Sequence, residues 1–149
     1  KWNEVMETKN ANGGAGFTEY NDGTIQFETT QWSQGYYDNG KIWQTFTLPA
    51  GKYEMRIEVK NAANIGSGST NIHFAVAQGE SLPDNEELEK SDIILSYLKF
   101  ESEHTNKTSA LPIFELTEEK TITVGWVVSF SDICRNIEFK SVRLWSVAE

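Results

Sequence analysis

The stretch 41–60, KIWQTFTLPAGKYEMRIEVK, decides the fold class of this chain. Its second half alternates strictly, so that apolar side chains occupy one face and charged side chains the other, in the order YEMRIEVK over 53–60. Such a pattern is typical of a strand in an antiparallel sheet with one buried face. The first half, 41–48, has the same period, and between the halves lies Pro49-Ala50-Gly51-Lys52, which favours chain reversal. We therefore expect 41–48 and 53–60 to form a hairpin.

The same period of two recurs on both sides of this stretch. It predicts further strands at 24–29, 71–77, 121–130 and 136–144. The segment 93–100 is apolar on both sides, which indicates a strand covered on both faces, or a bulge. In the 71–77 strand, His73 is expected on a polar face, opposite the apolar row. In the last strand, the apolar phase changes after Phe139, which predicts a β-bulge near Lys140 and Ser141.

Few helical signals accompany these strands. The best candidate is 81–90, which is too short to organise a fold. About seven or eight strands at short spacing, without long helices between them, argue against an α/β sheet. We therefore predict an all-β protein, a two-sheet antiparallel β-sandwich that forms a single domain over residues 1–149.

Composition narrows the classes of partner. The chain of 149 residues carries 13 basic and 22 acidic side chains, so its net charge is −9. A negative surface repels nucleic-acid phosphates and anionic lipid, and no apolar run is long enough to span a membrane. The single cysteine, Cys134, excludes an internal disulfide and is expected to be a small buried hydrophobe. Because the chain opens at Lys1 without an initiator Met, we expect that an N-terminal stretch has been removed.

Catalytic signatures are missing from the sequence. It contains no nucleophile elbow, no phosphate-binding loop and no His-Glu-x-x-His pattern. His73 and His104 are isolated from each other, and a solvated histidine is the common case. A glycosidase needs a facing pair of carboxylates, which the sequence cannot assign, so we expect the protein not to be an enzyme. The strand-borne candidates for such a pair are Glu28, Glu54, Glu58, Glu101 and Glu115.

The segment 31–40, QWSQGYYDNG, combines loop-forming residues with Trp32, Tyr36 and Tyr37. A flat aromatic face suits the C–H face of a sugar ring, while Asn39 and its polar neighbours, Gln34 and Asp38, can meet the hydroxyl groups. The alternative is that these aromatic side chains fold inward over the end of the core.

Two further residues extend this predicted binding site. Trp43 is out of phase with the apolar row of its strand, so it should point away from the core, and His73 is included from its polar face. Trp126 shares the phase of its apolar neighbours and is expected in the core. Trp2 and Trp145 are expected to be structural residues near the two termini.

The stretch QTFTLPAGKY at 44–53 resembles a hairpin of galactose-binding-like jelly rolls and carbohydrate-binding modules. With DGTIQFE at 22–28 and NIEFKSVRL at 136–144, the chain is similar to the DUF5013-type domains of Bacteroidetes surface proteins. The resemblance implies a jelly roll in a secreted, periplasmic or cell-surface protein, attached to other domains in a longer parent chain. It also implies a possible structural calcium, for which Glu4, Glu7 and Glu138 offer oxygens.

Three functions therefore remain open. The first is a non-catalytic carbohydrate-binding module whose loop aromatics stack on a glycan. The alternative is a structural or adhesive sandwich domain of a larger surface protein, without a sugar ligand. A third possibility, a sandwich-type glycoside hydrolase or lyase, depends on a carboxylate pair.

Overall fold

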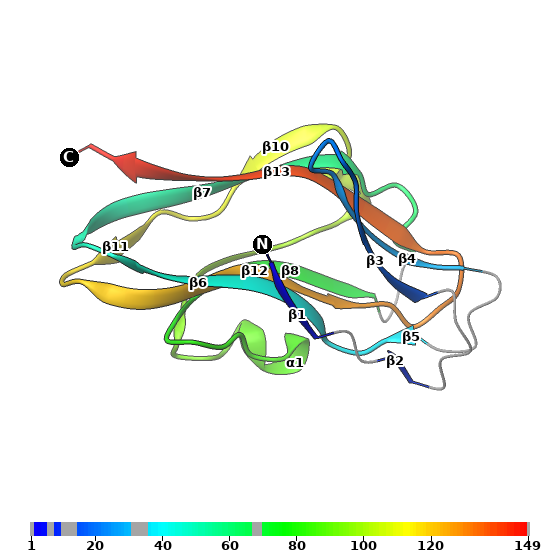
Figure 1. Cartoon of the computed structure of the whole chain (residues 1–149), viewed down its shortest axis with the longest axis horizontal. Coiled ribbons are helices and arrows are strands. Elements are labelled where there is room, and N and C mark those ends of the chain that lie inside the picture. The colour runs from blue at the N-terminus through cyan, green and yellow to red at the C-terminus, as the bar shows by residue number, and fades with distance from the viewer. Residues whose placement is uncertain (1, 6–7, 10–14, 31–35, 67–69, 149) are drawn as a thin grey trace.

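The computed structural model describes residues 2–5, 8–9, 15–30, 36–66 and 70–148. Its strands form two main antiparallel sheets that lie face to face (Figure 1). The predicted all-β sandwich is confirmed, and it has several short strands in addition to those expected. No helix within the described ranges is long and apolar enough to cross a membrane.

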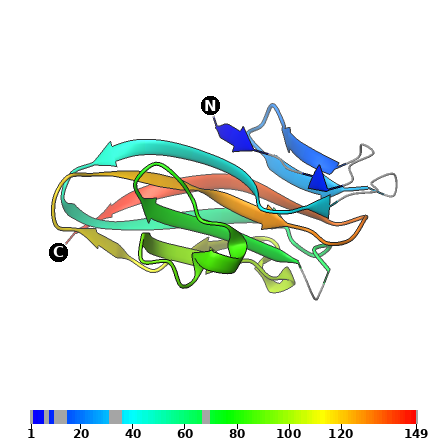
Figure 2. The same cartoon turned by 90° about the horizontal axis from the view of Figure 1, so that it is seen from below.

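The first sheet has five strands, and β12 lies at its centre. Their order is β1 (Asn3–Val5), β6 (Gly40–Leu48), β12 (Lys120–Ser129), β8 (Asn71–Gln78) and β9 (Ile94–Lys99). The short helix α1 (Asn85–Leu88) lies against the outer side of this sheet, as Figures 1 and 2 show.

The second sheet has β13 at its centre. The order along it is β10 (Lys107–Ala110), β7 (Gly51–Asn61), β13 (Asn136–Val147), β4 (Ile25–Thr29) and β3 (Ala15–Glu19), while β11 (Phe114–Leu116) also pairs with β7. A separate pair joins β2 (Thr8–Lys9) to β5 (Tyr36–Tyr37), and one 3₁₀ turn, η1, covers Ser102–His104.

The predicted hairpin at 41–60 is wrong. Strand β6 pairs with β1 and β12, whereas β7 pairs with β10, β11 and β13, so the two strands belong to different sheets. The turn after Leu48 carries the chain from one layer to the other, and the Tyr53 hydroxyl donates a hydrogen bond to the Pro49 carbonyl oxygen (2.8 Å). The alternating pattern fits both arrangements, because it specifies which face is buried and not which strand is the neighbour.

The core between the sheets is rich in aromatic side chains. Trp126 is 1% exposed, which confirms its predicted core position, and its ring centroid lies 4.9 Å from those of Phe74 and Phe139. Trp2 packs on it at 5.0 Å, as its expected structural role requires. Burial of such rings is the main favourable contribution to folding of a sandwich of this size.

The predicted bulge in β13 is also confirmed. The register of β13 against β7 shifts on both sides of Phe139, before Ser141. Because one extra residue reverses the phase of the strand, Val142 and Leu144 pack against the same core as Phe139.

Two predictions of burial are wrong. Cys134 is exposed, because it lies in the turn before β13 with a left-handed backbone (φ 57°). His73 is fully buried, because α1 and the segment before it cover the face of β8 that the alternating pattern left to solvent. Under that cover lies a second, smaller core of Ala75, Ala77, Leu82, Leu88 and Val127.

Candidate functional site

The aromatic segment that motivated a sugar site falls largely outside the part of the chain that the structure describes. Trp32 and Gln34 lie outside the described residues. Tyr36 and Tyr37 form β5, whose backbone pairs with Lys9 and Thr8, but their side chains are also outside the description. A role for these three aromatic side chains stays a prediction.

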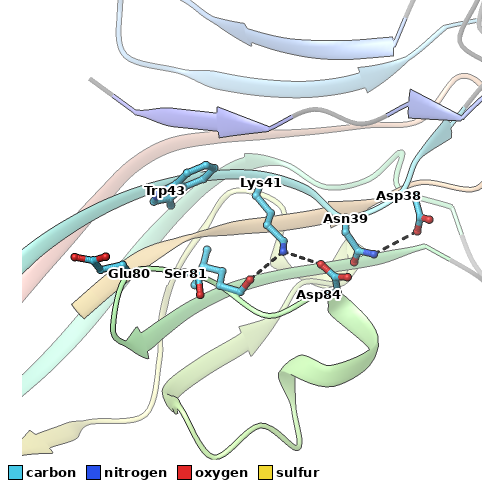
Figure 3. A pocket seen from close by; sticks show the side chains of 8 residues that line it. Asp38, Asn39, Lys41, Trp43, Glu80, Ser81 and Asp84 are labelled. Atoms are coloured by element: carbon cyan, nitrogen blue, oxygen red, sulfur yellow. Dashed lines mark hydrogen bonds and ion pairs between the residues drawn. The ribbon is translucent and has the colours of Figure 1, made fainter. Parts of the chain in front are cut away.

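Two of the predicted residues, Asn39 and Trp43, line one pocket on the outer side of the five-stranded sheet. Its volume is about 430 Å³. The start of β6 forms one wall, where Lys41 and Trp43 both point outward at the spacing of a strand. The other wall comes from the segment between β8 and α1 (Figure 3). The lining residues are Asp38, Asn39, Lys41, Trp43, Glu80, Ser81, Leu82 and Asp84.

Asn39 joins the two walls of the pocket. Its backbone is left-handed (φ 57°), a conformation that asparagine adopts more readily than most residues. Its Oδ1 accepts a hydrogen bond from the backbone N–H of Asn85, the first residue of α1 (2.7 Å). The N-cap residue Asp84 makes no side-chain capping hydrogen bond. The Asn39 side chain, which is distant in sequence, therefore caps the N-terminus of α1.

Lys41 makes the second connection. Its Nζ donates hydrogen bonds to the Leu82 carbonyl oxygen (2.9 Å) and to the Asp84 carboxylate (2.7 Å). These contacts occupy the middle of the pocket, as Figure 3 shows, and leave Trp43, Glu80 and Ser81 together at one end. Trp43 is half-buried and packs against the second core, so the outward direction predicted for it is confirmed.

His73 does not line the pocket, although the sequence placed it in the same site. It lies beneath α1, where its Nδ1 is 2.8 Å from the Asn85 Oδ1 and its Nε2 is 3.5 Å from the Glu89 carboxylate. The Asn85 amide also donates to the Asn71 carbonyl oxygen (3.0 Å) and the Ser129 hydroxyl (2.8 Å). This buried polar network fixes α1 on the sheet and so supports one wall of the pocket.

The pocket combines an aromatic side chain with an excess of hydrogen-bond acceptors. Three carboxylates, those of Asp38, Glu80 and Asp84, stand against the single ammonium group of Lys41. Such a set can accept hydrogen bonds from several hydroxyl groups, while the indole offers apolar contact area. It is poorly suited to an anion.

The sequence reasoning missed most of this lining. Lys41 could have been found, because it shares the outward phase of Trp43 two residues later. Glu80, Ser81 and Asp84 carried no signal, because they come from a turn about 40 residues further along the chain, which only the tertiary fold brings to β6.

The predicted calcium finds no support in the described side chains. No group of three or more His, Cys, Asp or Glu residues in these ranges could hold a metal ion. Glu138 forms an ion pair with Lys60 (3.8 Å), while Glu7 and the side chain of Glu4 lie outside the description. A structural calcium therefore stays a prediction without assigned ligands.

Comparison with known proteins supports the fold. The model of the family described as "Domain of unknown function (DUF5013)" matches residues 1–125. No curated protein matches the chain in sequence. Among solved structures, TmCBM61 in complex with β-1,4-galactotriose is similar at 13% identity and a TM-score of 0.51, with 98% of this chain and 88% of that chain covered. The carbohydrate recognition domain of Emp47p is similar at 10% identity and a TM-score of 0.55, with 99% and 89% covered.

Proposed function

The chain belongs to the DUF5013 family, whose description names no activity, and we propose from the geometry of its pocket that it is a non-catalytic carbohydrate-binding module. The ligand is an uncharged glycan, one ring of which lies in the pocket beside Trp43. The observation that carries this proposal is the combination of a half-buried indole with three carboxylates in a pocket of about 430 Å³.

The chemistry of the lining fits a neutral sugar. A pyranose presents C–H groups on one face, which pack on an indole, and hydroxyl groups at its rim, which donate to carboxylates. Glu80 and Ser81 are exposed and lie at the same end of the pocket as Trp43. Lys41 is already bound to Leu82 and Asp84, so it shapes the wall and leaves the hydroxyl contacts to Glu80 and Ser81.

The comparisons give this proposal secondary support. TmCBM61 has a similar fold and was solved with β-1,4-galactotriose, which makes that trisaccharide a suitable first probe. The predicted aromatic residues Trp32, Tyr36 and Tyr37 precede β6 directly in the chain, and we propose that they extend the same site beyond its Asp38 end.

The test is a titration of ¹⁵N-labelled protein with β-1,4-galactotriose, in which binding is monitored by NMR. We expect weak binding, with a Kd near one millimolar, which corresponds to about 4 kcal/mol. Trp43→Ala and Glu80→Gln should each weaken binding at least about tenfold, because each removes one of the two kinds of contact. Tyr20→Ala changes an aromatic side chain that is 47% exposed and lies outside both candidate sites, and it is the matched control.

Three other outcomes of these experiments would contradict parts of the proposal. Binding that survives both Trp43→Ala and Glu80→Gln would place the sugar elsewhere and overturn the site. If a wide panel of neutral oligosaccharides shows no binding, the alternative is favoured, a structural or adhesive domain in which Trp43 only packs against the second core. Cleavage of any of these glycans would contradict the non-catalytic assignment.

We also propose that the domain works outside the cytoplasm, as a secreted, periplasmic or cell-surface part of a longer parent chain. A glycan-binding module meets its polysaccharide ligands there. The test is to add a protease to intact producing cells: if the domain is displayed on the cell surface, the protease should digest it. If the domain is protected from the protease both in intact cells and in osmotically opened cells, the proposal is contradicted.

A further inference from the structure

The outer side of the six-stranded sheet carries a second candidate site, far from α1. Trp145 on β13 is 44% exposed, although its position near the terminus predicted a structural role. The guanidinium of Arg56 on β7 lies over its ring, 5.3 Å from the centroid. A hollow of about 170 Å³ beside this pair is lined by Arg56, Glu58, Thr108, Ser141, Arg143 and Trp145.

This hollow continues along the sheet. Glu58 and Thr108 also line an adjoining hollow of about 370 Å³, to which Lys60, Lys107 and Lys140 contribute. We call the two hollows together the β7–β13 trough. Within the described residues the trough is lined by five cationic side chains, those of Arg56, Lys60, Lys107, Lys140 and Arg143, and by one carboxylate, that of Glu58.

Such a concentration of positive charge is unexpected in a chain with a net charge of −9. Arg143 and Arg56 are direct partners in the register of β13 and β7, and like charges placed opposite each other destabilise a sheet. Neighbouring carboxylates offset only part of this charge, since Glu54 binds Arg56 (2.6 Å) and Glu138 is 3.8 Å from Lys60. Arg143, Lys107 and Lys140 make no ion pair with any residue that the structure describes.

We propose that the β7–β13 trough binds an acidic glycan, a chain of uronate residues, with one ring against Trp145 and carboxylates on the cationic side chains. Guanidinium groups bind carboxylates through charge-assisted hydrogen bonds. The hydroxyl groups of Thr108 and Ser141 and the exposed indole suit the rest of a sugar ring. The trough is short and the protein is acidic elsewhere, so the ligand is a short uronate stretch, and extended nucleic acids and flat anionic membranes are repelled.

The test is a titration of the intact domain with an oligogalacturonate of three or four residues, at low and at high salt, by NMR. Binding should weaken with salt, because screening acts on exposed charge pairs. Arg143→Gln and Trp145→Ala should each weaken binding at least about fivefold. Lys90→Gln, which removes the same charge from the segment after α1, is the matched control and should leave binding unchanged.

The design separates this site from the Trp43 pocket. Trp43→Ala should weaken binding of galactotriose at least about tenfold and leave oligogalacturonate binding intact, so one proposal can fail while the other stands. The trough is refuted if oligogalacturonate does not bind, or if its binding survives both Arg143→Gln and Trp145→Ala. Equal or tighter binding of a single-stranded oligonucleotide or of phosphatidylserine vesicles would also overturn the assignment to a glycan.

Discussion

The outer sides of the two sheets are built on opposite principles. On the five-stranded sheet, α1 and the segment before it cover β8, and a second core with a buried polar network lies beneath them. On the six-stranded sheet, the outward side chains of β7 are charged and remain in contact with solvent. The covered face therefore carries a pocket between two walls, whereas the open face carries a shallow trough in which a ligand is bound mainly by electrostatic attraction.

The largest effect is expected from a substitution in β12, the strand at the centre of the covered sheet. Gly125 on β12 has no room for a side chain, because a Cβ there would collide with the Ile42 carbonyl oxygen and come within 2.7 Å of the Cα of Trp43. Gly125→Val should therefore destabilise the protein by more than about 3 kcal/mol. Urea unfolding measures this, and Thr108→Val on the open face should change stability by less than about 0.5 kcal/mol.

The buried network should have the next largest effect. Asn85 is 3% exposed, and its side chain bonds to His73, to the Asn71 carbonyl oxygen and to Ser129. Asn85→Ala leaves these groups without a partner and should cost about 2–3 kcal/mol. Ser129→Ala removes fewer bonds and should cost about 1 kcal/mol. If thermal melts show that Asn85→Ala has no effect, α1 is not held to the sheet by this network.

Ion pairs at the surface should matter much less on both faces. The Lys41–Asp84 pair of the covered face also involves the Leu82 carbonyl oxygen, whereas the Arg56–Glu54 pair of the open face is joined only by the contact of Arg56 with the Trp145 ring. Because all four side chains are partly exposed, Lys41→Met should cost about 1 kcal/mol and Arg56→Gln about 0.5 kcal/mol or less. Unfolding at low and high salt checks this, and a larger cost for Arg56→Gln would reverse the expected ranking.

The smallest effect concerns pH at the edge of the covered face. A hydrogen bond to Glu89, and the charge of that carboxylate, raise the pKa of Tyr97 above its ordinary value of 10.0. The neutral phenol is therefore favoured in the folded state, so its contribution is complete below pH 10 and is lost as pH rises through the folded pKa. Comparing unfolding at pH 8 and at about pH 11 should show less alkaline loss in Tyr97→Phe than in the parent protein.

The contrast between the faces also explains what the sequence could predict. The alternation of 53–60 correctly gave the buried and solvent faces of β7, because no element in the described part of the chain covers its charged side. The same reasoning failed at His73, because a period of two says which face a side chain is on but not what covers that face. It failed again at the 41–60 hairpin, because β6 and β7 pair with the central strands β12 and β13, which come from the last third of the chain.

The residues of the candidate site were likewise only partly predictable from the sequence. Trp43 could be predicted to point outward from its own strand, so part of the β6 wall of the pocket was visible in the sequence. Glu80, Ser81 and Asp84 reach it only through the path of the chain after β8. Trp145 was assigned by its place near the terminus, and its exposure beside Arg56 depends on the bulge that sets the phase of β13.

The place of β12 and β13 in the chain has a consequence for how the protein is made. They are the last two strands of the described chain, yet each lies in the middle of its sheet. During translation, β6, β7 and β8 leave the ribosome before either central strand exists, and each carries an apolar row and unpaired backbone groups until residues 120–147 follow. Unpaired strands of this kind are where nascent chains aggregate. Assembly therefore waits for the C-terminal end, and a ribosome that stalls before β12 leaves a chain without the centre of either sheet.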